Sequence, residues 1–164
     1  MLVVKPFHQR LGFCGPSCLK MVLNYYGTTV TERELARLTK ANTSRGTDAK
    51  HISAAAKKFG HEASIEDFAT IGMISTLVNK RRIPVIVNYF FINEPHYAVV
   101  IDIDTENIYV QDPLDGTTKA MRIFDFKKIW FGFMGQWPQE KRDFAIRRII
   151  VVYPKKSKKK SKTR

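Results

Sequence analysis

A cysteine at the start of an amphipathic helix places the strongest constraint on how this chain folds. The helix is predicted within the stretch Phe7–Gly27, FHQRLGFCGPSCLKMVLNYYG, and begins at Cys14. Pro16 fits its first turn, because the N–H that proline lacks would have no intrahelical partner there. Gly27 is a suitable C-terminal cap. Apolar residues recur between these ends at the spacing of one helix face, at Leu19, Val22, Leu23 and Tyr26.

The position of Cys14 affects the reactivity of its thiol. The N-terminus of a helix carries partial positive charge, which favours thiolate over thiol and makes this cysteine a candidate nucleophile. The alternative is a small buried residue at the start of a core helix. Cys18, one turn later, is expected in the core.

Length and composition indicate one globular domain with a charged end. The 164 residues are 44% hydrophobic and 12% aromatic, as expected of a chain that folds around a core. The net charge of +13 is uneven, because residues 141–164 hold eleven Lys or Arg and one acid. We expect a domain at 1–153 and a disordered basic tail at 154–164, which could contact nucleic acid or an anionic surface weakly.

Neither a targeting signal nor a membrane span is visible in the sequence. The N-terminus lacks the apolar core of a secretory signal, and no run of about twenty apolar residues could span a membrane. Two cysteines four residues apart make no disulfide framework and favour a reducing compartment. We therefore expect a soluble, cytoplasmic protein without a transmembrane segment.

Helices are predicted in the first half of the chain and strands in the second. A capping box, TERE, begins a short helix at Thr31, a third helix begins at Thr47 or Asp48, and a weaker helix covers Asp67–Lys80. A short helix is also expected over Phe126–Phe131. Segments rich in β-branched and aromatic residues predict strands at Ile83–Phe91, Tyr97–Ile103, Ile108–Gln111, Thr117–Ile123 and Phe144–Tyr153. This order indicates an α+β fold, with a helical half packed on an antiparallel sheet.

Two further residues with catalytic chemistry lie on neighbouring predicted strands. His96 opens one strand, and Asp112 ends the next, where Pro113 stops further pairing. A tight turn at Asp104–Asn107 would place both at the same end of the sheet, close enough for a carboxylate to orient an imidazole. A cysteine, a histidine and a carboxylate together supply the nucleophile, the base and the orienting group of a thiol hydrolase.

Three other aspartates could take the place of Asp112 as the orienting carboxylate. They are Asp102, Asp104 and Asp115. Turns explain the presence of Asp104 and Asp115, because aspartate side chains accept hydrogen bonds from nearby backbone N–H groups in turns.

An ordered set of short motifs between residues 6 and 132 resembles a known family. The motifs are Gln9, Cys14-Gly15-Pro16, Tyr25-Tyr26-Gly27, Gly46-Thr47, Pro84, His96-Tyr-Ala-Val-Val, Asp112-Pro113 and Trp130-x-Gly132. Together they are similar to the C39 peptidases, which are papain-like cysteine proteases best known as the leader-cleaving domains of bacteriocin-exporting ABC transporters. The resemblance implies a papain-like fold with Cys14 as nucleophile, His96 as general base and Asp112 as its orienter. It also implies that Gln9 donates its side-chain amide to the oxyanion, together with the backbone N–H of Cys14.

The sequence departs from this family's pattern in several places. Gln9 lies five residues before Cys14, whereas the family's glutamine is commonly six before, a position that His8 holds here. The oxyanion donor is therefore open between Gln9 and His8. No phosphate-binding loop appears, so we expect a stand-alone peptidase, and the double-glycine leader specificity of the transporter domains is not carried over. A separate segment, Met134–Asp143, precedes the final strand.

These observations predict a cysteine peptidase that hydrolyses a peptide or related amide bond in a peptide or protein substrate. No cofactor or metal is expected, because no pair of cysteines or histidines has the spacing of a zinc finger. The alternative is a non-catalytic protein, either a papain-like module that binds peptides or a basic protein whose tail holds nucleic acid. The presence of cysteine, histidine, aspartate and glutamine together favours the enzyme.

Overall fold

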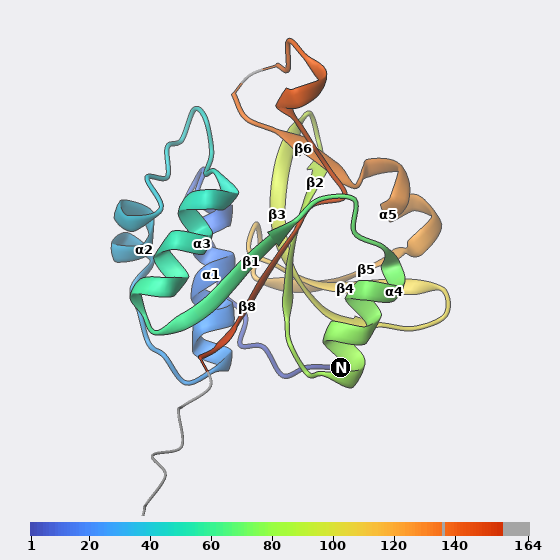
Figure 1. Ribbon diagram of the computed structural model, residues 1–164, viewed down its shortest axis with the longest axis horizontal. Coiled ribbons are helices and arrows are strands. Elements are labelled where there is room, and N and C mark those ends of the chain that lie inside the picture. Colours follow the sequence, from blue (N-terminus) through green and yellow to red (C-terminus); the bar gives the residue numbers. More distant parts are fainter. Residues whose placement is uncertain (136, 156–164) are drawn as a thin grey trace, which may run out of the picture.

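The computed structural model describes residues 1–135 and 137–155, and most of the predicted basic tail therefore lies outside the described residues. Three helices come first: α1 (Cys14–Tyr25), α2 (Glu32–Leu38) and α3 (Ala49–Lys58). Figure 1 shows them grouped together at one side of the molecule, with the strands beside them. Strand β1 (His61–Glu66) then leads to α4 (Ile71–Ser75), which continues as one π-helical turn to Lys80.

The second half of the chain forms most of a six-stranded antiparallel sheet. Its strands lie in the order β1-β8-β2-β3-β4-β5, and β6 pairs separately with β7. Helix α5 (Ile123–Ile129) follows β5, and a short 3₁₀ turn (Lys141–Asp143) precedes β7. The strand bounds are β2 (Val85–Phe91), β3 (Glu94–Ile103), β4 (Asn107–Asp112), β5 (Thr117–Arg122), β6 (Phe131–Phe133), β7 (Phe144–Ile146) and β8 (Ile149–Pro154).

Local signals explain where the first helices begin. The Thr31 hydroxyl accepts a hydrogen bond from the backbone N–H of Glu34 at 3.2 Å, as the capping box predicts. Of the two predicted caps for α3, Asp48 is the one used, and its carboxylate accepts from the Lys50 N–H at 2.9 Å. On α1, the face predicted to be buried enters the core, and Cys18 is fully buried as expected.

The structure differs from the sequence prediction in four places: one strand that was not predicted and three elements whose bounds differ. Strand β1 was not predicted, and the helix expected at 126–131 is α5 followed by β6. Strand β3 begins at Glu94, so His96 lies inside the strand instead of opening it. The strand predicted over Phe144–Tyr153 is divided at Arg147, whose φ of 49° is left-handed. Its two parts therefore join different sheets, β7 pairing with β6, and β8 with β1 and β2.

The packing of helices on an antiparallel sheet confirms the predicted α+β fold. Buried side chains from α1, α3 and the central strands form one core cluster. A glycine allows β6 to approach this core, because a Cβ on Gly132 would overlap the side chain of Asn88 on β2. Within residues 1–135 and 137–155, no helix has both the length and the apolar character needed to cross a membrane.

Candidate active site

The pairing of the strands brings His96 and Asp112 together. Tyr89 of β2 stands directly opposite His96 of β3, and their rings pack edge to face with centroids 5.6 Å apart. The His96 Nε2 atom lies 2.7 Å from Oδ1 of Asp112, at the end of β4. Both side chains are buried, and Asp112 is fully so. The predicted proximity of the imidazole and this carboxylate is therefore present in the fold.

The competing aspartates are engaged elsewhere. Asp104 accepts hydrogen bonds from the backbone N–H groups of Glu106 and Asn107, both at 2.7 Å. Asp115 accepts from the N–H of Thr117 at 3.1 Å, and Asp102 lies 3.1 Å from the N-terminal ammonium group. The two turn positions thus have the structural role that the sequence indicates.

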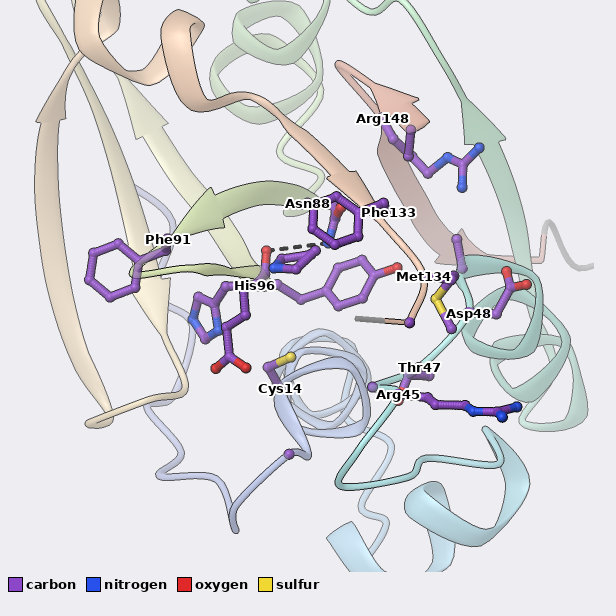
Figure 2. A pocket seen from close by; sticks show the side chains of 18 of the residues that line it. Cys14, Arg45, Thr47, Asp48, Asn88, Phe91, His96, Phe133, Met134 and Arg148 are labelled. Carbon is purple, nitrogen blue, oxygen red and sulfur yellow. Dashed lines mark hydrogen bonds between the residues drawn. The ribbon is translucent and has the colours of Figure 1, made fainter. Parts of the chain in front are cut away.

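Cys14 lies in the same pocket as His96. Its side chain extends from the start of α1 into the pocket near His96 (Figure 2). With Nε2 directed at Asp112, the Nδ1 side of the ring remains for the thiol. The second cysteine differs in its surroundings, because complete burial raises the pKa of the Cys18 thiol well above its usual value.

The electrostatics of the site favour a charged imidazole and a charged carboxylate. Burial alone would lower the pKa of His96, but the hydrogen bond to Asp112 and the neighbouring Cys14 outweigh it and raise that pKa to about 9. Burial would likewise raise the pKa of Asp112, but the hydrogen bond to His96 and the one from Lys119 hold it well below its usual range. An imidazolium–carboxylate pair is therefore expected at neutral pH.

The sequence reasoning missed two side chains that contact Asp112. The Lys119 Nζ atom of β5 lies 2.8 Å from Oδ2 of Asp112, and the Tyr89 hydroxyl lies 3.5 Å from the same oxygen. The register of the β4–β5 hairpin could have indicated Lys119, because Thr117 pairs with Asp112 and the residue two positions later points to the same face.

The structure brings Gln9, and not His8, to the pocket. The backbone N–H of Gln9 donates to the Pro113 carbonyl at 2.8 Å, which ties this segment to the end of β4. The Gln9 side chain lines the pocket, and its Oε1 is buried without a hydrogen-bond partner among the described residues. His8 is exposed and packs beside Gly116.

Close packing explains the small residues around Cys14. A Cβ added to Gly15 would lie 2.9 Å from the Cβ of Thr47, so the loop before α3 rests directly against the start of α1. Gly12 has a left-handed φ of 77°, and a Cβ there would lie 2.7 Å from the Thr43 Cα atom. Glycine at both positions allows the loop to form one wall of the pocket.

The pocket that contains Cys14 and His96 has a volume of about 570 Å³. Its walls come from the start of α1, the loop at 43–50, the β2–β3 hairpin and the ends of the β6–β7 pair. Five exposed apolar side chains lie along it: Leu11, Ile92, Leu114, Met134 and Phe144. No group of three or more metal-ligating side chains occurs within the part of the chain that the structure describes.

Comparisons with known proteins agree with this architecture. The sequence model of the Peptidase C39 family matches residues 9–135. LagD of Lactococcus lactis subsp. lactis, a lactococcin-G-processing and transport ATP-binding protein, is 28% identical over 147 residues. That match covers 83% of this chain and 19% of LagD, so the chain spans about a fifth of the length of this relative.

Solved structures share the fold across almost the whole chain. The peptidase domain of Streptococcus ComA, a bifunctional ABC transporter of a quorum-sensing pathway, matches with a TM-score of 0.72 and 26% identity. That match covers 93% of this chain and 99% of the ComA domain. A double-glycine-motif protease from an AMS/PCAT transporter, in complex with a leader peptide, matches with a TM-score of 0.67 and 19% identity, over 93% and 92% of the two chains. The protein therefore has a papain-like fold, belongs to the peptidase C39 family and is a cysteine-type peptidase.

Proposed function

We propose that the protein hydrolyses a peptide bond with Cys14 as nucleophile, His96 as general base and acid, and Asp112 as the group that orients His96. The observation that carries the proposal is the 2.7 Å contact between buried His96 and Asp112, beside the Cys14 thiol. An imidazolium next to a thiol at a helix N-terminus favours the thiolate, which is the attacking form.

The reaction would proceed through an acyl-enzyme. The Cys14 thiolate attacks the carbonyl carbon, and the resulting oxyanion accepts hydrogen bonds from the Gln9 side-chain amide and the Cys14 backbone N–H. Collapse expels the amine, which takes a proton from the His96 imidazolium. Neutral His96 then removes a proton from water, which attacks the thioester and releases the acid and the thiolate.

Two observations support Gln9 as an oxyanion donor. Its side chain lies on the pocket wall that also holds Cys14, and its backbone is anchored to the carbonyl of Pro113. The Cys14 N–H belongs to the first turn of α1, where backbone N–H groups have no intrahelical partner and can serve a ligand.

The substrate in this proposal is a peptide chain that lies along the pocket. A related domain was solved with a leader peptide bound, and LagD is a processing protein for lactococcin G, so peptides that carry Gly-Gly before the scissile bond are the first to test. Contact of the basic tail with an anionic polymer stays a prediction, because the tail falls mainly outside the described residues.

The proposal is tested by assaying purified variants on Gly-Gly peptides and on a mixed peptide library. Cys14→Ala and His96→Ala should each abolish turnover, because nucleophile and base act as a unit. Cys18→Ala is the matched control, since this buried thiol should be dispensable. Cleavage that persists in Cys14→Ala would contradict the thiol mechanism. A wild-type protein that cleaves no peptide would contradict the proposed hydrolysis.

A further inference from the structure

The carboxylate of Asp112 is held from two sides. Its Oδ1 accepts hydrogen bonds from His96 Nε2 at 2.7 Å and from the Leu114 backbone N–H at 2.9 Å. Its Oδ2 accepts from Lys119 Nζ at 2.8 Å, with the Tyr89 hydroxyl at 3.5 Å. Two cations, the imidazolium and the ammonium, therefore share one fully buried carboxylate when His96 is protonated.

The fold fixes Lys119 in this position. Its strand β5 places it on the same face as Asp112, its Nζ also lies 3.1 Å from Oδ2 of Asp115, and the ammonium sits 5.6 Å from the centroid of the Phe91 ring. The Lys119 side chain is only 30% exposed. Ion pairing, partial burial and the aromatic face together restrict the ammonium to a single place.

We propose that Lys119 is a positioning residue of this site, one that fixes the Asp112 carboxylate and offsets part of the negative charge acting on His96. It would not touch the substrate, and it would act on the reaction only through Asp112. This inference rests on the function proposed above and adds a residue to the machinery that tunes the base.

The charge of Lys119 affects the protonation of His96 in one direction. The ammonium repels the imidazolium across Asp112, so it makes the proton on His96 easier to lose. Other ionisable groups near His96, Asp112 or Cys14 are Cys18 of α1, Tyr89 of β2, Tyr97 of β3 and Asp115 of the β4–β5 turn. The pocket is also lined by the acids Asp48, Glu94 and Asp143 and by the cations Arg45, Lys50, Arg142 and Arg148. Among the described residues, none of these four cations contacts His96 or Asp112, so removing Lys119 removes the ammonium that is bound to the carboxylate.

Lys119→Met should therefore shift the loss of the His96 proton to higher pH. A unit positive charge on the other side of one carboxylate, at an effective dielectric constant of about 20–40, corresponds to a shift of about 1–2 pKa units. Proton donation to the leaving amine should become harder, and we expect kcat on a cleaved peptide to fall about 3- to 10-fold with KM unchanged.

The experiment follows the rate of Cys14 alkylation by iodoacetamide against pH, in a Cys18→Ala background that leaves one thiol. The rate should show a transition near the pKa of His96, because a thiolate paired with an imidazolium reacts differently from a free thiolate. This readout needs no peptide cleavage. Thermal unfolding of each variant reports whether the fold is retained.

Two further variants separate charge from structure. Lys119→Arg keeps the positive charge, so its transition should lie at the same pH as in the wild type. This comparison can be made even if Lys119→Met does not fold. Lys58→Met removes a lysine at the far end of α3, about 13 Å along the helix from Ala49, which lines the pocket, and should change nothing.

The outcomes are distinguishable. An upward shift in Lys119→Met that is absent in Lys119→Arg and Lys58→Met supports the inference. Superimposable profiles for wild type and folded Lys119→Met would overturn it, as would a transition in Lys119→Arg displaced as far as in Lys119→Met. A wild-type profile without any transition would instead contradict the pairing of Cys14 with His96, and with it the proposed function.

Discussion

His96 Nε2 lies 2.7 Å from Oδ1 of Asp112, and neither side chain is accessible enough for water to compete for that contact. Asp112→Asn removes the charge but keeps the size of the side chain. We expect it to lower kcat by about 10- to 10⁴-fold, because the amide cannot stabilise the imidazolium and can select the wrong imidazole tautomer. Steady-state kinetics check this, with Asp104→Asn, in an exposed turn, as the control. Equal rates for the wild type and Asp112→Asn would contradict an orienting role.

The same pair makes the stability of the fold depend on pH. The pKa of His96 is raised to about 9, so its contribution is complete below the unfolded value of about 6.5 and is lost as pH rises through 9. The free energy of unfolding, measured with urea, should therefore fall between about pH 6.5 and 9. His96→Gln should flatten this alkaline decline. A decline of equal steepness in that variant would show that another group causes it.

At acid pH, the free energy of unfolding should rise with pH instead of falling. The pKa of Asp112 is held below its usual range, chiefly by His96 and Lys119 against the cost of burial. Its contribution is present above the unfolded value of about 3.9 and is lost as pH falls below it. In the same urea measurement, Asp112→Asn should lose less stability at acid pH than the wild type does. If the variant loses as much stability as the wild type, other carboxylates cause the loss.

The oxyanion donor can be identified by comparing two neighbouring residues. Gln9→Ala should lower kcat about 10- to 1000-fold with little change in KM, as expected for the loss of one donor to the transition state. His8→Ala should have no such effect, because His8 is exposed and does not line the pocket. The reverse result would assign the donor to His8, in agreement with the family's usual spacing of six residues.

Gly132 tests the packing between β6 and β2. Gly132→Ala would force its new Cβ into Asn88, so we expect a loss of about 1–3 kcal/mol in the free energy of unfolding. Gly72→Ala is the control, because the nearest atom to a Cβ there is 3.8 Å away and the residue lies within helix α4. Equal stability of Gly132→Ala and the wild type would show that β6 can move away from the sheet freely.

The parts of the fold that the sequence predicted depend on local signals. The start of α1, the capping box at Thr31 and the turn at Asp104–Asn107 are each set by residues within a few positions of one another. The pairing of His96 with Asp112 was predictable for the same reason, because one short turn joins their two strands.

The parts that were missed depend on distant segments. Strand β1 has the sequence HEASIE, which lacks an alternating pattern, and it is a strand because it pairs with β8 almost ninety residues later. The strand is divided at Arg147 because the backbone there is left-handed. The carbonyls of Ile146 and Arg147 accept hydrogen bonds from the backbone N–H groups of Phe68 and Ala69, which are distant in the sequence. The contact of Lys119 with Asp112 requires the exact register of β5, which the composition of that strand does not fix.

The most direct test of the account is to map the cysteine that iodoacetamide modifies first in the folded protein near neutral pH. Cys14 lies at the start of α1 beside His96, whereas Cys18 is fully buried and burial raises the pKa of its thiol. We predict that mass spectrometry of partly labelled protein finds Cys14 modified much faster than a free thiol, with Cys18 modified slowly. Modification of Cys18 first, or of both cysteines at the rate of a free thiol, would contradict the assignment of Cys14 as the nucleophile.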